Sequence, residues 1–444
     1  MKRKPVFARF RSARLYVLVT VCVSLFTDMI TYSIIVPIIP FALESIEHGR
    51  SPDNPTSDPY HSALSEPGNV SKDSGVLLAL FSVGLIVGSI GFGYLGDRLK
   101  HRQGLMLAGI LGLLGSTLLF MLGQLYWELL LARFLQGFSD ACVWTLGMCL
   151  ISDTFPLEEL GTQMGRVMMF HSIGMVAGAP IGVERKNNPP EWFEKETIVD
   201  STSKKDDIES TDMTISSQEE KEEIKNQKPV TYLRLLKQHR LLAGMLMAFS
   251  NAVVIGTFET TLSIRLATEW GYNSSQIGIL FIAEVAPAFI ASPLAGMIAD
   301  KYGPKIVVIP TWLLCSVALL LTGIPNKSTA GGIAPLVVLL VIQGFCVAAF
   351  LTPVLSEIGY VVQSQNPDGG DDGQGRSYGL FNVAFALGGI VGPLLGGYLY
   401  SAIGFFWLCI VAGCFLLVCS PYVFFFVGGR GKLIVRSPKV NREE

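Results

Sequence analysis

Two acidic residues lie inside long apolar stretches of the sequence, where an unpaired charge is expensive. Asp28 lies midway along the stretch that starts near Leu15, and Glu259 lies in the stretch that starts near Leu241. An unpaired charge at the centre of a bilayer costs at least about 2.5–3.5 kcal/mol. A carboxyl group kept away from water takes up a proton readily and can exchange it for a cation. We therefore expect Asp28 and Glu259 to bind protons or cations; the alternative is that each only bonds a neighbouring helix.

Arg133 is a third charged candidate within an apolar stretch. Asp140 follows it by seven residues, which places the two side chains on one face of a helix. An internal ion pair between them is the structural alternative to a functional role for Arg133. Glu284 and Glu357 are further acidic candidates in apolar stretches.

The composition indicates that most of this chain lies in a membrane. Of its 444 residues 50% are apolar and 16% charged, with a mean hydropathy of +0.46, whereas soluble domains carry about 25% charged residues. Between Glu184 and Arg240 lie 24 of the 70 charged residues. The net charge of −2 offers no basic face for nucleic acid. The 8 cysteines lie in apolar stretches without the spacing of a metal site or a disulfide framework.

Eleven apolar stretches are long enough to cross a bilayer, since a hydrocarbon core of about 30 Å needs roughly 20 helical residues. They start near residues 15, 74, 104, 126, 160, 241, 275, 304, 334, 378 and 405. We predict an all-α membrane protein in five parts. A basic cytoplasmic N-terminus (1–14) precedes a five-span bundle (15–182), a polar linker (183–240), a six-span bundle (241–428) and a cytoplasmic tail (429–444).

The two bundles repeat each other's short motifs. The turn GYLGDR at 93–98 corresponds to GMIADK at 296–301, and GMVAGAPIG at 174–182 corresponds to GGIVGPLLG at 388–396. More than 30 mostly apolar residues follow Pro393, but the chain becomes polar at Glu184, soon after Pro180. The repeat therefore predicts twelve spans in two six-helix bundles, with the sixth span missing from this chain.

The repeated motifs are candidates for conformational control. A glycine allows two helices to approach closely, a proline bends a helix, and a carboxylate such as Asp97 can face the N-terminus of a helix from the other half. A plain basic turn and ordinary packing are the alternatives. The candidates are Gly93, Asp97, Arg98, Gly296, Asp300, Gly174, Gly178, Pro180, Gly392 and Pro393.

Three glycosylation sequons, at Asn69, Asn273 and Asn326, bear on the topology. With twelve spans all three lie outside, while both repeated turns and both termini lie inside. With eleven regular spans the second half is inverted, which places Asp300 and the basic tail outside, against the positive-inside tendency.

Several motifs together resemble the major facilitator superfamily. They are GYLGDRLKHR at 93–102, RFLQG at 133–137 and GMVAGAPIG at 174–182. The segments DMITYSIIVPIIP at 28–40, VWT at 143–145, EELG at 158–161 and FE at 258–259 are more similar to its drug:proton antiporter branch, and within it to fungal members like the vesicular monoamine transporters. The resemblance covers nearly the whole chain and implies two pseudo-symmetric six-helix bundles, whose sixth helix is absent here.

The resemblance also implies roles for several residues. The turn at 93–98 would latch the outward-open state, and the stripe at 174–182 would seal the cavity against proton leak. Asp28 and Glu259 would bind the substrate ammonium or a proton, and Arg133 would take part in proton coupling. Where those amine transporters carry a lysine in the second span, this chain has Phe81.

Two further positions depart from that pattern. Ala348 stands at their tenth-helix aspartate and Asn382 at their eleventh-helix aspartate. Much of that proton machinery is therefore absent, and a monoamine substrate does not follow. We keep Asn382 among the candidate substrate- or proton-binding residues.

We expect a non-enzymatic, proton-coupled antiporter that exports small organic cations or drugs by alternating access. A proton-independent uniporter or importer of a neutral solute, and a non-transporting truncated product, stay open as alternatives. Because no GxxxxGK[ST] loop is present, nucleotide-driven transport is not expected, nor is any cofactor or metal. The expected partners are a small-molecule substrate, protons and the bilayer, without nucleic acid. The expected state is a monomer in the plasma membrane or a vacuolar or vesicular membrane.

Overall fold

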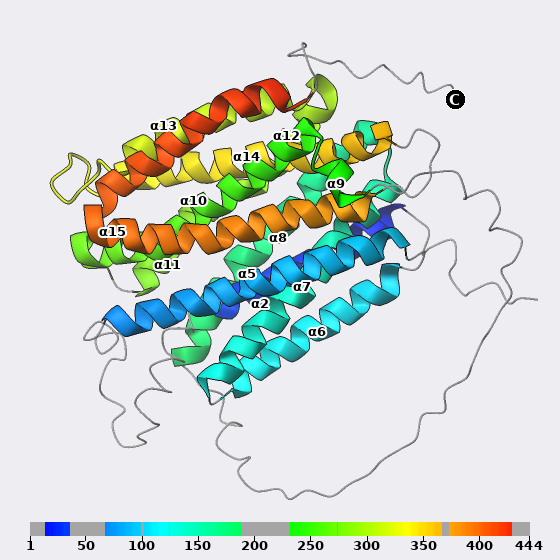
Figure 1. Cartoon of the computed structure of the whole chain (residues 1–444). Coiled ribbons are helices and arrows are strands. Elements are labelled where there is room, and N and C mark those ends of the chain that lie inside the picture. Colours follow the sequence, from blue (N-terminus) through cyan, green and yellow to red (C-terminus); the bar gives the residue numbers. More distant parts are fainter. Residues whose placement is uncertain are drawn as a thin grey trace, which may run out of the picture.

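The computed structural model of the chain describes residues 14–35, 67–98, 102–123, 125–187, 231–272, 274–365 and 373–428. Within these ranges the chain is almost entirely helical and holds no strand (Figure 1). The N-terminal arm before Arg14, the tail after Gly428, Asn273 and most of the predicted linker lie outside the described residues. The helices are α2 (Arg14–Ile35), α5 (Pro67–Arg98), α6 (Arg102–Leu122), α7 (Tyr126–Thr154), α8 (Leu157–Asn187), α9 (Tyr232–Leu235), α10 (His239–Trp270), α11 (Ser274–Val285), α12 (Ala288–Tyr302), α13 (Lys305–Thr322), α14 (Ala334–Gln365) and α15 (Gln374–Phe426).

Nine helical segments of the described chain are long and apolar enough to cross a membrane. One of them joins α11 to α12, and another is the whole of α15, which bends at Gly404 where φ is 78°. That positive φ divides α15 into two legs, residues 374–403 and 405–426. With the second leg of α15 and with the 31-residue but more polar α8, the membrane-length segments number eleven. The predicted all-α membrane fold is confirmed.

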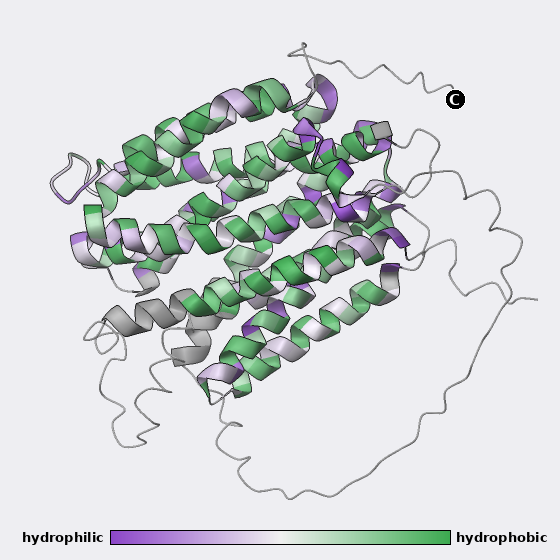
Figure 2. Cartoon of the chain, in the orientation of Figure 1, coloured by the Kyte–Doolittle hydropathy of each residue, from purple (hydrophilic) through white to green (hydrophobic). Residues whose placement is uncertain are grey.

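Apolar residues cover the lengths of the helices, and hydrophilic residues gather at their ends (Figure 2). The end to the right in that view holds α9 and the ends of several long helices. We call this end the turn face, because it holds Asp97 at the end of α5 and Asp300 near the end of α12. Both repeated turns therefore lie at the same end of the molecule.

Helices of the two halves pack in matching pairs. Within the first half α8 packs along α2, and within the second half α15 packs along α10. Between the halves α5 packs against α15, and α8 packs against α12. This arrangement is the pseudo-symmetry that the sequence repeat predicts.

The two halves differ at the outer wall. Helix α13 packs between α14 and α15, whereas α6, at the corresponding place, packs mainly on α7. Only 28% of the apolar segment of α6 is buried, against 50% for α13. Among the described helices none covers α6 as the second leg of α15 covers α13.

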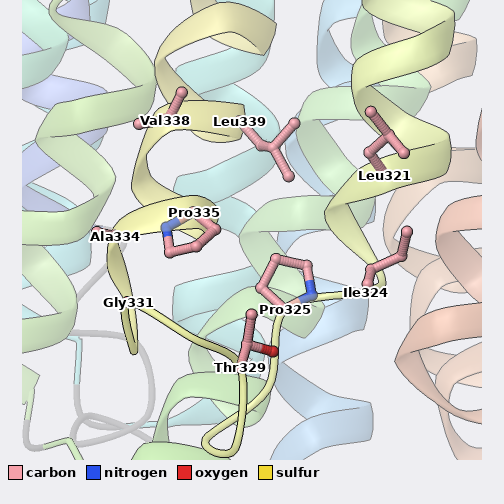
Figure 3. Close-up of a pocket in the computed structure, with 9 residues that line it drawn as sticks. All are labelled: Leu321, Ile324, Pro325, Thr329, Gly331, Ala334, Pro335, Val338 and Leu339. Atoms are coloured by element: carbon pink, nitrogen blue, oxygen red, sulfur yellow. The ribbon is translucent and has the colours of Figure 1, made fainter.

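A hollow of about 550 Å³ lies between α13 and α14 at the end away from the turn face (Figure 3). Pro325 and Pro335 face each other across it, with Leu321, Ile324, Val338 and Leu339 around them. Its lining carries no charged side chain and does not include any of the candidate site residues.

Candidate functional site

A cluster of polar side chains from α2, α7 and α10 lies within the apolar interior. Asp28 and Tyr32 come from α2, and Arg133 and Asp140 come from α7. Glu259, from α10, adds a carboxylate from the second half and interacts electrostatically with Arg133 and Tyr32. Three of the predicted residues, Asp28, Arg133 and Glu259, are thus brought together.

Asp28 and Asp140 form a pair of acidic side chains. Both are buried, with 3% and 4% of their surfaces exposed, and their carboxyl groups are hydrogen-bonded to each other. Such a bond needs a proton between the two groups, because a carboxylate can only accept. One oxygen of each side chain, Oδ2 of Asp28 and Oδ1 of Asp140, has no protein partner. The pair can therefore hold one proton and still offer two acceptor atoms.

Arg133 is fully buried, and its contacts are not those of the ion pair with Asp140 that was the structural alternative. Its Nη1 donates to Oε1 of Gln136 at 2.9 Å, and its guanidinium lies 5.2 Å from the ring centre of Phe120 and 5.8 Å from that of Tyr32. Its Nε and Nη2 have no partner. An Arg133–Asp140 ion pair is not formed, because the carboxyl group of Asp140 bonds Asp28 instead.

Asn382 connects the two halves. It lies in α15 with 5% of its surface exposed, and its Nδ2 donates to Oγ1 of Thr145 in α7 at 3.2 Å. Because α7 and α15 belong to different halves, this bond must break when the halves separate there.

At the turn face, Asp97 lies against the N-terminus of α15. Its Oδ1 accepts from the amide of Gly375 at 2.6 Å and its Oδ2 from the amide of Arg376 at 3.2 Å. Nε of Arg376 lies 3.4 Å from the same Oδ2. Free amides and the positive end of the helix dipole stabilise a carboxylate at this position. The side chain of Arg98 lies over the ring of Tyr94, 4.5 Å from its centre.

Asp300 makes the equivalent contact from the second half to α8. Its Oδ1 accepts from the amide of Gly161 at 2.8 Å, and its Oδ2 accepts from the amide and Oγ1 of Thr162, each at 2.6 Å. These residues lie in the first turns of α8. Together Asp97 and Asp300 hold the two halves closed at the turn face.

Glycines permit the close approach that these bonds require. A Cβ on Gly93 would lie 2.8 Å from the carbonyl oxygen of Gly375, and a Cβ on Gly296 would collide with the carbonyl of Gly161. Real Cβ atoms do not approach other atoms so closely, so larger side chains would push the halves apart.

The stripe glycines pack inside each half rather than between the halves. A Cβ on Gly174 would lie 2.5 Å from the carbonyl oxygen of Phe26, and one on Gly178 would lie 2.7 Å from that of Ile30, both in α2. In the second half, a Cβ on Gly392 would lie 2.7 Å from the carbonyl oxygen of Val253 in α10. Pro393 packs on Gly256 of α10. Pro180 lies in α8, but its side chain is outside what the structure describes.

Two tyrosines at the turn face were not among the sequence candidates. Tyr232, in the four-residue helix α9, donates through its hydroxyl to the carbonyl of Ile90 in α5 at 2.8 Å, and burial raises the pKa of Tyr232 to about 12. Tyr360 of α14 donates to the carbonyl of Leu157 at 2.9 Å. Both hydrogen bonds join the second part of the chain to helices of the first part that are far away in sequence.

Of the three sequons, only Asn326 has a described side chain. It lies in the loop between α13 and α14, at the end opposite the turn face, where its Oδ1 accepts from Ser328 and Thr329. Asn69 lies in α5, but its side chain, like all of Asn273, is outside the described residues.

Comparison with known proteins shows the family to which the chain belongs. The family model described as Major Facilitator Superfamily matches residues 21–183 and 242–442. An MFS-type transporter of Schizosaccharomyces pombe, C18.02, is 26% identical over 429 aligned positions, covering 88% of this chain and 90% of that protein. The synaptic vesicular amine transporter of Mus musculus is 24% identical over 500 positions, covering 98% of this chain and 90% of that protein.

A solved structure supports the same conclusion for the fold. The crystal structure of the human organic anion transporter MFSD10 (TETRAN) aligns with a TM-score of 0.65 and 18% identity, over 92% of this chain and 99% of that one. The family match covers most of both halves and is interrupted where the polar segment follows α8. This chain belongs to the major facilitator superfamily of membrane transporters.

Proposed function

We propose that this transporter is a proton-coupled antiporter that exports small organic cations, drugs among them. The observation that supports it most is the intramembrane cluster, in which Asp28 pairs with Asp140 and Arg133 interacts electrostatically with Glu259 of the second half. An acid that holds a proton in one state and a cation in another exchanges one for the other by mass action.

The residues of the cluster suit different steps. Glu259 of α10 interacts electrostatically with Arg133 and Tyr32 of the first half, so its carboxylate faces the boundary between the halves, where it can meet an ammonium group. The occluded Asp28–Asp140 pair holds a proton. Arg133 attracts the carboxylate of Glu259, so a bound cation and Arg133 compete for the same group.

Alternating access follows from the contacts at the turn face. Asp97 and Asp300 close that face, so the substrate site would open to the opposite face in this state. Transport to and from the turn face requires these bonds and the Asn382–Thr145 bond to break. The amine transporter of Mus musculus, which matches 98% of this chain, supports a cationic substrate.

The remaining sequence predictions belong to this proposal. The chain would be organised as a five-span bundle, a polar linker and a six-span bundle. The turn face would be cytoplasmic, and the sequons Asn69, Asn273 and Asn326 would carry glycans on the other side. The protein would work as a monomer in the plasma membrane or in a vacuolar or vesicular membrane.

Transport in proteoliposomes tests the proposal. An imposed pH gradient should drive uphill movement of an organic cation such as tetraphenylphosphonium, and Asp28→Asn and Glu259→Gln should each abolish it. Glu269→Gln is the matched control, because Glu269 lies on the same helix as Glu259 but pairs with Arg265 at 3.1 Å near the helix end. Gradient-driven transport that survives in both Asp28→Asn and Glu259→Gln would refute the proposal.

A further inference from the structure

Glu284 is an intramembrane acid that the site above does not use. It lies in α11 and is half-buried, and its carboxylate interacts electrostatically with that of Glu259. Across from it in α14, Nε2 of Gln343 donates to Oε1 of Glu284 at 3.5 Å. Gln343 itself is fully buried, and its Oε1 has no partner.

The three side chains lie at one depth. Glu259 precedes the end of α10 by eleven residues, Glu284 follows the start of α11 by ten, and Gln343 follows the start of α14 by nine. All three helix ends lie opposite the turn face, and at 1.5 Å per residue the side chains are about 14–17 Å below them. Because α10 and α14 each have 32 residues, these side chains lie between the middle of the helices and the end opposite the turn face.

The membrane segment that carries Glu284 is broken next to it. Helix α11 ends at Val285 and α12 begins at Ala288. Because Pro287 has no amide hydrogen, the carbonyl of Ala283 loses the partner it would have in a continuous helix. Pro287 keeps helical dihedral angles (φ −58°, ψ −24°), so the junction is a proline kink with this carbonyl beside Glu284.

Helix α14 approaches this break without an intervening side chain. A Cβ on Gly344 would collide with the carbonyl oxygen of Glu284. Gly344 therefore lets Gln343 reach the Glu284 carboxylate, and it fixes the broken segment against α14.

The acidic groups around Glu284 favour the binding of one proton or cation near it. The carboxylate of Glu284 interacts electrostatically with Glu259 of α10 and with the thiol of Cys315 of α13. Arg133 of α7 interacts with Glu259. Two carboxyl groups that repel each other away from water bind one proton or cation more readily than they carry two negative charges.

We propose that Glu284, bonded by Gln343 at the α11–α12 break, is a second proton-binding site of this transporter, located in the second half. It holds a proton while Glu259 carries no substrate cation, and it releases the proton when that cation binds, so that the two move in opposite directions. Proton binding at Glu284 does not depend on transport, but its role in coupling rests on the function proposed above.

Infrared difference spectroscopy tests the protonation directly. The purified full-length protein in lipid is compared at acid and alkaline pH, without substrate. The wild type should have a carboxylic-acid C=O band that is lost as the pH rises, and part of that band should be missing in Glu284→Gln. In Glu284→Asp the band should remain at a shifted frequency, and Glu269→Gln should leave it unchanged. A band of equal size in the wild type and Glu284→Gln would overturn the proposal, as would a loss of the band when sodium is added at constant pH.

A flux experiment separates the site from its use. In proteoliposomes Glu284→Gln should lose net cation movement driven by a pH gradient but keep exchange of labelled for unlabelled cation at equal pH on both sides. Loss of exchange together with net movement would overturn the coupling role. If the wild type itself shows no gradient-driven movement, the proposed function fails while the infrared result still decides whether Glu284 holds a proton.

Discussion

At the residue scale, the contacts of Asp97 and Gly93 explain how the halves are held together at one face. Asp97 accepts two amide hydrogen bonds from the start of α15, and Gly93 supplies the space for that approach. The turn sequence alone predicts a carboxylate that faces a helix N-terminus, and Asp97 lies in that place. The sequence does not reveal which helix, because the partner is 278 residues away.

Asp97→Asn should shift the protein toward states that are open at the turn face. Hydrogen bonds to a charged group contribute about 1.5–3 kcal/mol, and an amide oxygen replaces them only in part. The distance between spin labels on α5 and α15 at the turn face, measured by electron paramagnetic resonance, should broaden to longer values. Distances that stay unchanged would show that Asp97 does not hold this face closed.

Gly93→Ala should act in the same direction through packing. The added methyl group would lie 2.8 Å from the carbonyl oxygen of Gly375, and overpacking of this kind costs about 1–3 kcal/mol. Gly91→Ala is a matched control, because a Cβ there meets nothing within 4 Å. The same spin-label distances and the thermal unfolding midpoint check the prediction; equal effects of the two variants would contradict it.

At the scale of elements, the predicted helices were recovered, but their breaks and partners were not. The stretch that starts near residue 275 reads as one continuous apolar span, because proline is tolerated in membrane helices. In the structure it is α11 and α12, separated at Pro287. Helix α9 has only four residues and lies inside a polar segment, so the sequence has no periodic pattern that predicts this helix or its contact through Tyr232.

Tyr232→Phe should loosen the attachment of α9 while leaving the helix bundle folded. The lost bond to the carbonyl of Ile90 is neutral, and such bonds contribute about 0.5–1.5 kcal/mol. Because the pKa of Tyr232 is raised to about 12, its hydroxyl stays protonated at physiological pH and this contact should not respond to pH there. Hydrogen exchange of α9 should become faster in the variant. Unchanged exchange of α9 would mean that the hydroxyl bond does not hold it.

At the scale of the whole molecule, the two halves keep the same direction. The sequence left two topologies open, and the structure places Asp97 and Asp300 at one face, as twelve spans require. Helix α8 starts at the turn face and α10 starts there as well, so the chain between them joins opposite ends of the bundle. In the first half no described helix covers the outer side of α6, and the sequence repeat predicts this gap from the polar segment after Pro180.

Labelling from one side of the membrane tests this orientation. In a background in which the exposed Cys414 is replaced by serine, Arg98→Cys and Lys301→Cys should react with a membrane-impermeant maleimide from the same side. Reaction from opposite sides would mean that the second half is inverted relative to the first.

If this transporter is an antiporter, protons and an organic cation move in opposite directions through it. The most direct measurement is the pH inside proteoliposomes, followed with a trapped dye while a cation gradient is applied without any initial pH gradient. We predict that protons move against the cation flux in the wild type and that this movement is absent in Glu259→Gln. Cation movement without any proton movement would contradict proton coupling and favour proton-independent transport.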